Sequence, residues 1–223
     1  FKTKQAAALN TEQVIQLSED KQFQGLSTAA IQALSTRQFS LFSSANLPLL
    51  STTQVAVIET KDIAAINSFG FGLMTSVQLA AFTTDQVKAV TTRQFSVINS
   101  NTISSLSTTQ IGVLTTKQMV GMASEMLSFM TSAQLSGFAT KTIAGLDSRQ
   151  IKGLSTDIRG LSTLQVAGMN TLQAQTLLTT QLNAMGTAQI AAIETKDLQA
   201  VTSRQMFGID SIQIAAFTTK QIA

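Results

Sequence analysis

The chain has 223 residues, of which 44% are hydrophobic and only 12% are charged, and it contains no Cys, His, Trp or Tyr. Such a chain can bury a core, but the missing residue types exclude a disulfide framework, a thiolate metal site and an imidazole general base. The net charge of +3 is far below the enrichment in Lys and Arg that nucleic-acid-binding domains show, so we expect no nucleic-acid partner.

An eight-residue repeat runs along the whole sequence. Counted from a first Ser or Thr, repeats begin at residues 3, 11 and 28, then every eight residues from 28 to 156, and again every eight from 163 to 219. Residues 19–27 form a nine-residue repeat and residues 156–162 a seven-residue repeat. Because no linker or change in composition divides the repeats, we predict one domain over residues 1–223, as a window of a longer array.

The consensus predicts one short helix per repeat. It reads Ser/Thr, variable, Gln, apolar, variable, small, apolar, Ser/Thr/Asn, as in "TTQIGVL" at 108–114. Positions four and seven, for example Val55 and Ile58, are three apart, which suits one face of a helix and not a strand. Position eight is Ser, Thr, Asn or Asp in 21 of 27 complete repeats. With Gln three residues later, this pattern is a capping box, so we predict a helix of about two turns in each repeat.

Helices this short must stack on neighbours, because nucleation of an isolated two-turn helix is too costly in water. We therefore predict an all-α solenoid that forms a single elongated rod. A β-solenoid is the alternative, since Thr, Val and Ile favour strands. Position six is Ala or Gly in 17 of 27 repeats, which predicts a close backbone approach between neighbouring helices.

The sequence also contains a longer repeat, which has two explanations. The segment "TRQFSLF" at 36 returns as "TRQFSVI" at 92, "SRQIKGL" at 148 and "SRQMFGI" at 203, after 56, 56 and 55 residues. Duplication alone would explain this super-repeat of seven. Alternatively, seven repeats make two coils of 3.5, so that each helix lies between two helices of the coil below. Stacked coils would then form a rod of roughly 70–80 Å.

The basic residues share a register. Eleven of the 15 Lys and Arg residues occupy position two or its equivalent. They are either a solvated exterior or a row that faces an anionic partner, such as a neighbouring subunit or a surface glycan. The residues predicted for such an interaction stripe are Lys61, Arg93, Lys117, Lys141, Arg149, Lys196 and Arg204.

No residue pattern points to catalysis, a metal or a cofactor, so we expect that the protein is not an enzyme. Ser and Thr occur in every repeat, and none is singled out as a nucleophile. Asp62 and Asp197 replace the consensus Gln, and we expect them to accept capping hydrogen bonds. The Gly-rich segment 68–72 keeps the phase of the repeat. No apolar run reaches the length that a membrane-spanning helix requires.

With "TTQIGVL" and "TAQIAAI" (187–193), the chain resembles the tandem short-repeat arrays of large bacterial secreted or surface proteins of the adhesion or haem-utilisation type. The resemblance covers nearly all residues and implies an extracellular or cell-surface structural protein, such as a filament, sheath or adhesin stalk, that associates with other subunits. Haem binding finds no support, because the sequence has no His, Cys or Tyr to hold iron. The alternative is a solenoid that binds a glycan, a peptide or another anionic partner.

Overall fold

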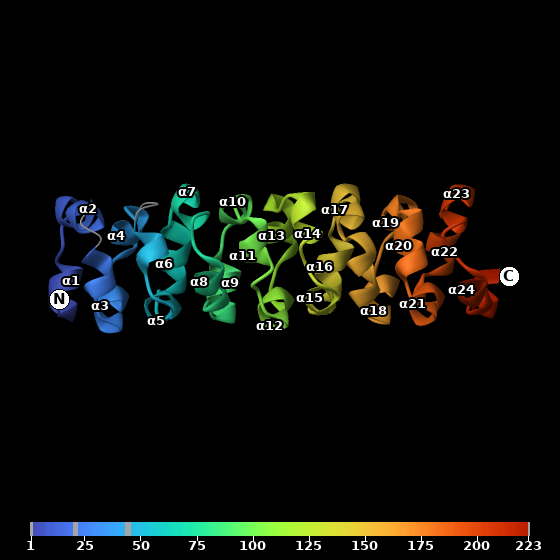
Figure 1. The fold of residues 1–223 in the computed structure, drawn as a ribbon, viewed down its shortest axis with the longest axis horizontal. Coiled ribbons are helices and arrows are strands. Elements are labelled where there is room, and N and C mark those ends of the chain that lie inside the picture. Colours follow the sequence, from blue (N-terminus) through green and yellow to red (C-terminus); the bar gives the residue numbers. More distant parts are fainter. Residues whose placement is uncertain (1, 20–21, 43–45, 223) are drawn as a thin grey trace. The chain divides into compact units, whose positions relative to one another are not determined.

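The computed structural model describes residues 2–19, 22–42 and 46–222. All regular structure in these ranges is helical and none is strand (Figure 1). This confirms the all-α prediction over the β-solenoid. The chain groups into two compact halves, Phe1–Gln110 and Ile111–Ala223, and the border falls inside helix α12. The single domain predicted for residues 1–223 stays a prediction.

The helices of the N-terminal half follow one another with only a few residues between them. They are α1 (Thr3–Ala7), α2 (Thr11–Glu19), the 3₁₀ helix η1 (Gln22–Gly25), α3 (Thr28–Gln32), α4 (Thr36–Ser40), the 3₁₀ helix η2 (Leu47–Leu49), α5 (Thr52–Ala56), α6 (Thr60–Ala65), α7 (Ser68–Phe71), α8 (Ser76–Ala80), α9 (Thr84–Ala89), α10 (Thr92–Phe95), α11 (Ser100–Ile103) and α12 (Thr108–Gly112), which ends just beyond the border.

The C-terminal half continues the same pattern. Its helices are α13 (Thr116–Gly121), α14 (Ser124–Leu127), α15 (Ser132–Ser136), α16 (Thr140–Ala144), α17 (Ser148–Gly153), the 3₁₀ helix η3 (Ser155–Gly160), α18 (Thr163–Ala167), α19 (Thr171–Thr176), α20 (Thr179–Ala184), α21 (Thr187–Ala192), α22 (Thr195–Leu198), α23 (Ser203–Met206), α24 (Ser211–Ala215) and α25 (Thr219–Ile222).

The predicted capping boxes set where the helices begin. At α8, the Thr75 hydroxyl accepts the Gln78 N–H at 3.2 Å, and the Gln78 Oε1 accepts the Thr75 N–H at 2.8 Å. The helix ends in a tighter turn, where Phe82 N–H donates to the Leu79 carbonyl at 3.1 Å. The α-helical part of a typical repeat therefore covers four to six residues, and this i→i+3 turn completes the predicted two turns.

Positions four and seven build the core. Every position-four side chain from Ala6 to Leu198 is buried, and every position-seven side chain from Leu17 to Ile193 is buried. Three Phe rings meet near the N-terminus, with centroids 4.5 Å apart for Phe23 and Phe42 and 4.8 Å for Phe39 and Phe42. The apolar spacing in the sequence thus identifies the core correctly.

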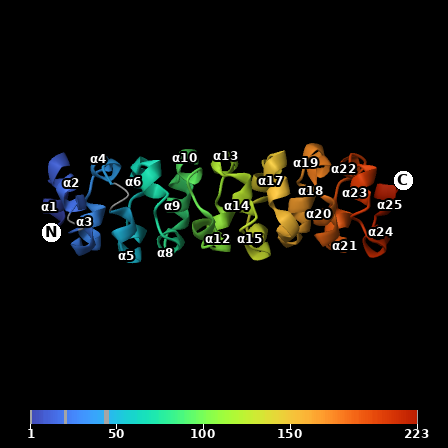
Figure 2. The same cartoon turned by 45° about the horizontal axis from the view of Figure 1, so that its top comes forward.

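Each helix lies between two helices of the preceding coil. In the N-terminal half, α8 packs against α5, which lies three repeats earlier. Gln78 on α8 also donates a hydrogen bond to the Leu50 carbonyl, which lies 28 residues earlier, in the fourth repeat back. In the C-terminal half α21 packs against α18 in the same way (Figure 2). A 28-residue offset equals 3.5 repeats of eight. Within each half, the predicted half-repeat stagger between coils is confirmed.

The two irregular repeats are absorbed without loss of this stagger. Across the nine-residue repeat, Gln38 reaches the Leu9 carbonyl over 29 residues, and across the seven-residue repeat, Gln165 reaches the Phe138 carbonyl over 27. Both irregular repeats form 3₁₀ helices, η1 and η3. The shorter one also requires Ser155 to adopt a left-handed backbone with φ of 52°. A lost residue is therefore compensated locally, and the coil offset is preserved.

Glycine at position six permits the predicted close approach between coils. A Cβ added to Gly153 would overlap with the carbonyl oxygen of Ser124, and one added to Gly208 would overlap with that of Thr179. Ser124 and Thr179 are position-one residues three repeats earlier. Only a residue without a side chain leaves room for this backbone contact.

Candidate interaction surface

Position-two cations form a row in the N-terminal half. Gln38, beside Arg37, donates to the Ala6 carbonyl of α1, the helix that carries Lys4. Helices α4 and α6, which carry Arg37 and Lys61, pack against each other (Figure 1). Gln94, beside Arg93, then donates to the Ile63 carbonyl of α6. Each of these contacts connects one coil to the next. One cation per coil therefore lies along one face, in the order Lys4, Arg37, Lys61 and Arg93. We call these four residues the first cationic row.

A second cationic row lies in the C-terminal half and consists of Lys117, Arg149 and Arg204, with Lys141 and Lys196 beside it. Gln150, next to Arg149, donates to the Met119 carbonyl of α13, the helix of Lys117. Helix α19, which carries Leu172, packs against α17, the helix of Arg149. Gln205 on α23, the helix of Arg204, donates to the Ala174 carbonyl of α19. Leu172 therefore stands in the row between Arg149 and Arg204, where a cation would be expected.

The fold also places the two neighbours of the second row. Helix α16, with Lys141, packs against α13, and helix α22, with Lys196, packs against α19. The seven residues predicted as an interaction stripe therefore divide between the two rows and these neighbours. All seven side chains are exposed.

Two of the cations are partly neutralised by acidic neighbours. Lys61 pairs with Glu59 at 2.6 Å, and Lys196 pairs with Glu194 at 2.7 Å. Hydrogen bonding to these carboxylates and their negative charge raise the pKa of Lys61 and of Lys196, so both stay charged at any physiological pH. Within residues 2–19, 22–42 and 46–222, no ion pair involves Arg37, Arg93, Arg149 or Arg204. The Arg side chains therefore carry the charge that is open to a partner.

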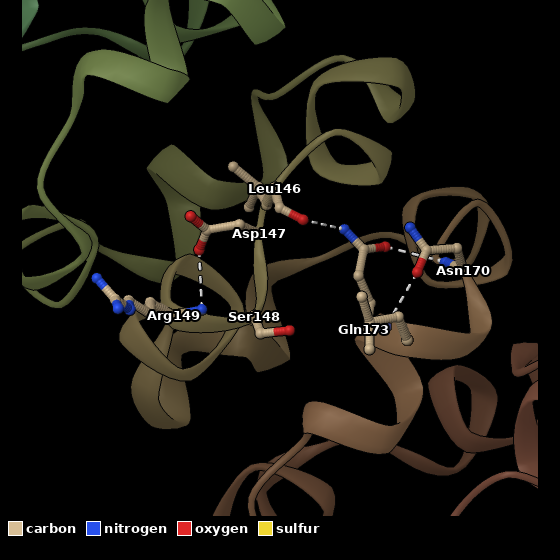
Figure 3. A pocket seen from close by; sticks show the side chains of 7 residues that line it. Leu146, Asp147, Ser148, Arg149, Asn170 and Gln173 are labelled. Carbon is tan, nitrogen blue, oxygen red and sulfur yellow. Dashed lines mark hydrogen bonds between the residues drawn. The ribbon is translucent and has the colours of Figure 1, made fainter.

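A shallow groove of about 300 Å³ lies between adjacent coils where the second row passes from Arg149 to Leu172 (Figure 3). On one side, Asp147 caps α17 and accepts the Arg149 N–H at 2.8 Å. On the other side, the Gln173 side chain donates to the Leu146 carbonyl at 2.8 Å and accepts the Asn170 N–H at 2.9 Å. Asp147, Asn170 and Gln173 already make hydrogen bonds within and between the helices, so we interpret the groove as a structural seam. The Arg149 guanidinium at its edge makes no ion pair with a described residue.

Similar grooves recur at other inter-coil seams. One of about 390 Å³ is bordered by Lys117 and Lys141, and one of about 280 Å³ is bordered by Arg93. The arrangement that repeats is thus a seam between coils that is bordered by position-two cations. In the described part of the chain, no group of three or more His, Cys, Asp or Glu residues could hold a metal ion.

The two Asp residues at position three do not act as the sequence predicted. No capping hydrogen bond is found for Asp62 or Asp197; instead each accepts a hydroxyl from the coil below, from Thr36 at 2.6 Å and from Thr171 at 2.5 Å. Asp62 Oδ2 is buried without a partner. Desolvation raises the pKa of Asp62, although the Thr36 hydrogen bond and the charge of Lys61 partly oppose this shift. Asp62 and Asp197 therefore form contacts between coils and do not cap their own helices.

Sequence reasoning missed the second role of the consensus Gln. Its Oε1 closes the capping box, as predicted, but its Nε2 also donates to two main-chain carbonyls of the preceding coil; Gln86, for example, reaches Val55 and Ile58 at 2.9 and 2.7 Å. The signal was present in the sequence. Glu closes a capping box as well as Gln does, yet Gln prevails at position three, and only an amide has the extra donor.

Fold and contacts together define a solenoid repeat protein built from very short capped helices. None of the helices in the described ranges combines the length and the apolar character that crossing a membrane requires. The chain is similar to the ALTTAQ repeat family, whose model matches residues 55–92 and 190–223. No curated protein sequence matches the chain. The match falls once in each half, in repeats that keep the regular eight-residue spacing.

Proposed function

We propose that the chain is a non-enzymatic structural protein of a bacterium, which forms an extracellular filament, a sheath or the stalk of a cell-surface adhesin. The observation that supports this most is the recurrence of one cross-coil contact. The same Gln amide bonds appear at Gln78 and Gln94 in one half and at Gln150 and Gln213 in the other. A contact that any added repeat can reproduce suits an array whose length is its function.

The uniformity of the repeats also supports a structural role. An enzyme concentrates catalytic groups in one place, where their geometry is unique. Here every buried polar side chain in the described part of the chain is a position-three residue. Most of them bond to the preceding coil, as Gln86 does to the Val55 and Ile58 carbonyls. The resemblance to tandem-repeat arrays of bacterial surface proteins supports the extracellular location.

Electron microscopy of negatively stained protein tests this proposal. We expect purified protein to appear as narrow rods of roughly 70–80 Å per chain, or as filaments in which neighbouring subunits associate. A protein that stays monomeric at high concentration and binds one small molecule tightly at a single site would overturn the structural role.

Immunogold labelling of the source cells tests the location separately. We expect label on the cell surface or on material shed from it. Label confined to the cytoplasm would contradict the extracellular assignment, whatever the particles look like.

A further inference from the structure

We propose that the two cationic rows bind an extended acidic polysaccharide through its carboxylate groups. This inference goes beyond the structural role, and either can fail without the other. The first row is Lys4, Arg37, Lys61 and Arg93, and the second is Lys117, Arg149 and Arg204. Each row presents one cation per coil, except where Leu172 stands, and coils of packed helices are spaced by about 8–10 Å.

The rows arise from the arithmetic of the coil. With 3.5 repeats per coil, side chains at the same position stand above one another only when they are alternately three and four repeats apart. Lys4 and Arg37 are four repeats apart, Arg37 and Lys61 three, and Lys61 and Arg93 four. In the second row, Lys117 and Arg149 are four apart, and Arg149 and Leu172 three. Lys141 and Lys196 follow the same alternation on the other side of the row, since Lys141 is three repeats after Lys117 and Lys196 three repeats after Leu172.

The acidic residues leave the Arg members of the rows uncovered. Glu59 and Glu194 are engaged with Lys61 and Lys196. Asp85, on α9, packs close to α6 but pairs with Lys88 at 2.9 Å. Near Arg149, Asp147 accepts main-chain N–H groups. Glu125 lines the same groove as Arg149, but the two form no ion pair in the described part of the chain. The main positive groups are therefore two Arg guanidinium groups in each row: Arg37 and Arg93 in the first row, and Arg149 and Arg204 in the second.

A carboxylate polymer fits these groups better than a nucleic acid does. The Arg guanidinium presents paired donors that match the two oxygens of a carboxylate. Proteins that bind single-stranded nucleic acid add aromatic side chains on which bases stack, and neither row contains one. An evenly spaced row also suits a polymer whose charges recur at a regular interval, because one chain then engages several coils at once.

Matched single substitutions test the proposal on the full chain with polygalacturonate as the probe. Arg149→Gln removes a charge from the second row. Arg159→Gln lowers the net charge equally but acts on η3, which packs against α15 and α20 and lies off the row, and where Arg159 is 4.0 Å from Asp157. We expect the Kd for polygalacturonate at low salt to rise about two- to fivefold for Arg149→Gln and to stay almost unchanged for Arg159→Gln.

A gain of charge gives the converse test. Leu172→Arg fills the gap in the second row, and Ile212→Arg places the same charge on α24, which packs against α21, a helix that carries no member of the row. Leu172 and Ile212 are 62% and 70% exposed, so neither change disturbs the core. We expect about two- to fivefold tighter binding for Leu172→Arg alone, with unchanged circular dichroism for all four variants.

Three results would overturn the proposal. Equal changes within either matched pair would show that net charge and not the row governs binding. Absence of binding to polygalacturonate at low salt would remove the partner. Tighter binding to single-stranded DNA or to phosphatidylglycerol vesicles than to polygalacturonate would show that the rows recognise phosphate and not carboxylate.

Discussion

The Gln78 side chain ties two coils together by donating from Nε2 to the Leu50 carbonyl at 2.7 Å. The same nitrogen donates to Leu47 at 2.7 Å, while Oε1 accepts the Thr75 N–H at 2.8 Å. Gln78 is 3% exposed, so these bonds form away from water. One side chain therefore both starts its own helix and satisfies two main-chain carbonyls of the coil below.

Gln78→Glu should destabilise the protein by about 2–4 kcal/mol, because a buried carboxylate would face two carbonyl oxygens that have lost their donor. Gln13→Glu is the matched control. Gln13 makes the same capping bond, to Asn10 N–H at 2.9 Å, but it is exposed, so we expect a change within about 0.5 kcal/mol. Urea unfolding followed by circular dichroism measures both. Similar losses at the two positions would show that the cross-coil bonds contribute little.

Asp62→Gln should stabilise the protein at neutral pH by about 1–3 kcal/mol, because the amide would restore the consensus donor and remove a buried charge without a full set of partners. The raised pKa of Asp62 means that the folded state favours the protonated carboxyl. The stability that Asp62 contributes is thus present in acid and is lost as pH rises through the raised pKa.

The stability difference between Asp62→Gln and the parent protein should therefore grow as pH increases above 3.8, the ordinary pKa of an Asp side chain. Thermal unfolding at a series of pH values measures this difference. Asp85→Gln provides the control, since Asp85 is exposed and its replacement removes no buried charge. A difference that shrinks with rising pH would contradict the assignment of Asp62.

Gly153→Ala should destabilise the protein by about 1–3 kcal/mol, because the added methyl group would force the backbone of Ser124 away. Gly25→Ala is the comparison. A Cβ there meets nothing within 4 Å, so the smaller entropy loss of Ala should stabilise the protein by up to about 1 kcal/mol. Opposite signs in thermal unfolding are the expected result. An increase in stability for both variants would mean that the coils do not approach each other closely at position six.

Ser155→Gly should raise stability by about 0.5 kcal/mol, since Gly adopts the observed φ of 52° without the steric cost that Ser carries. Ser162→Gly serves as the control, because Ser162 caps α18 with φ of −69° and accepts the Gln165 N–H. Its loss should cost a few tenths of a kcal/mol. Calorimetric melting temperatures should therefore move in opposite directions, and a drop for Ser155→Gly would argue against the left-handed turn.

The sequence by itself determined the local structure and the core. Caps such as Thr75 act on the backbone three residues ahead, and the three-residue spacing of Val55 and Ile58 places both on one face whatever the rest of the chain does. The 56-residue interval between the "TRQF" segments suggested 3.5 repeats per coil as one of two explanations, because a super-repeat of seven closes after two such coils. Duplication explained the interval equally well, and the contacts between coils decided between the two.

Only the tertiary structure decided what depends on contacts between coils. Three such contacts involve residues that are 26 to 31 positions apart in the sequence. They are the hydrogen bonds from Gln78 Nε2, the burial of Asp62 against Thr36, and the close backbone approach that leaves no room for a side chain at Gly153. No local pattern encodes such contacts, since they form only once the coil offset is fixed. The alignment of Arg37 with Lys61 follows from the same offset, so the row became visible only when the coils were stacked.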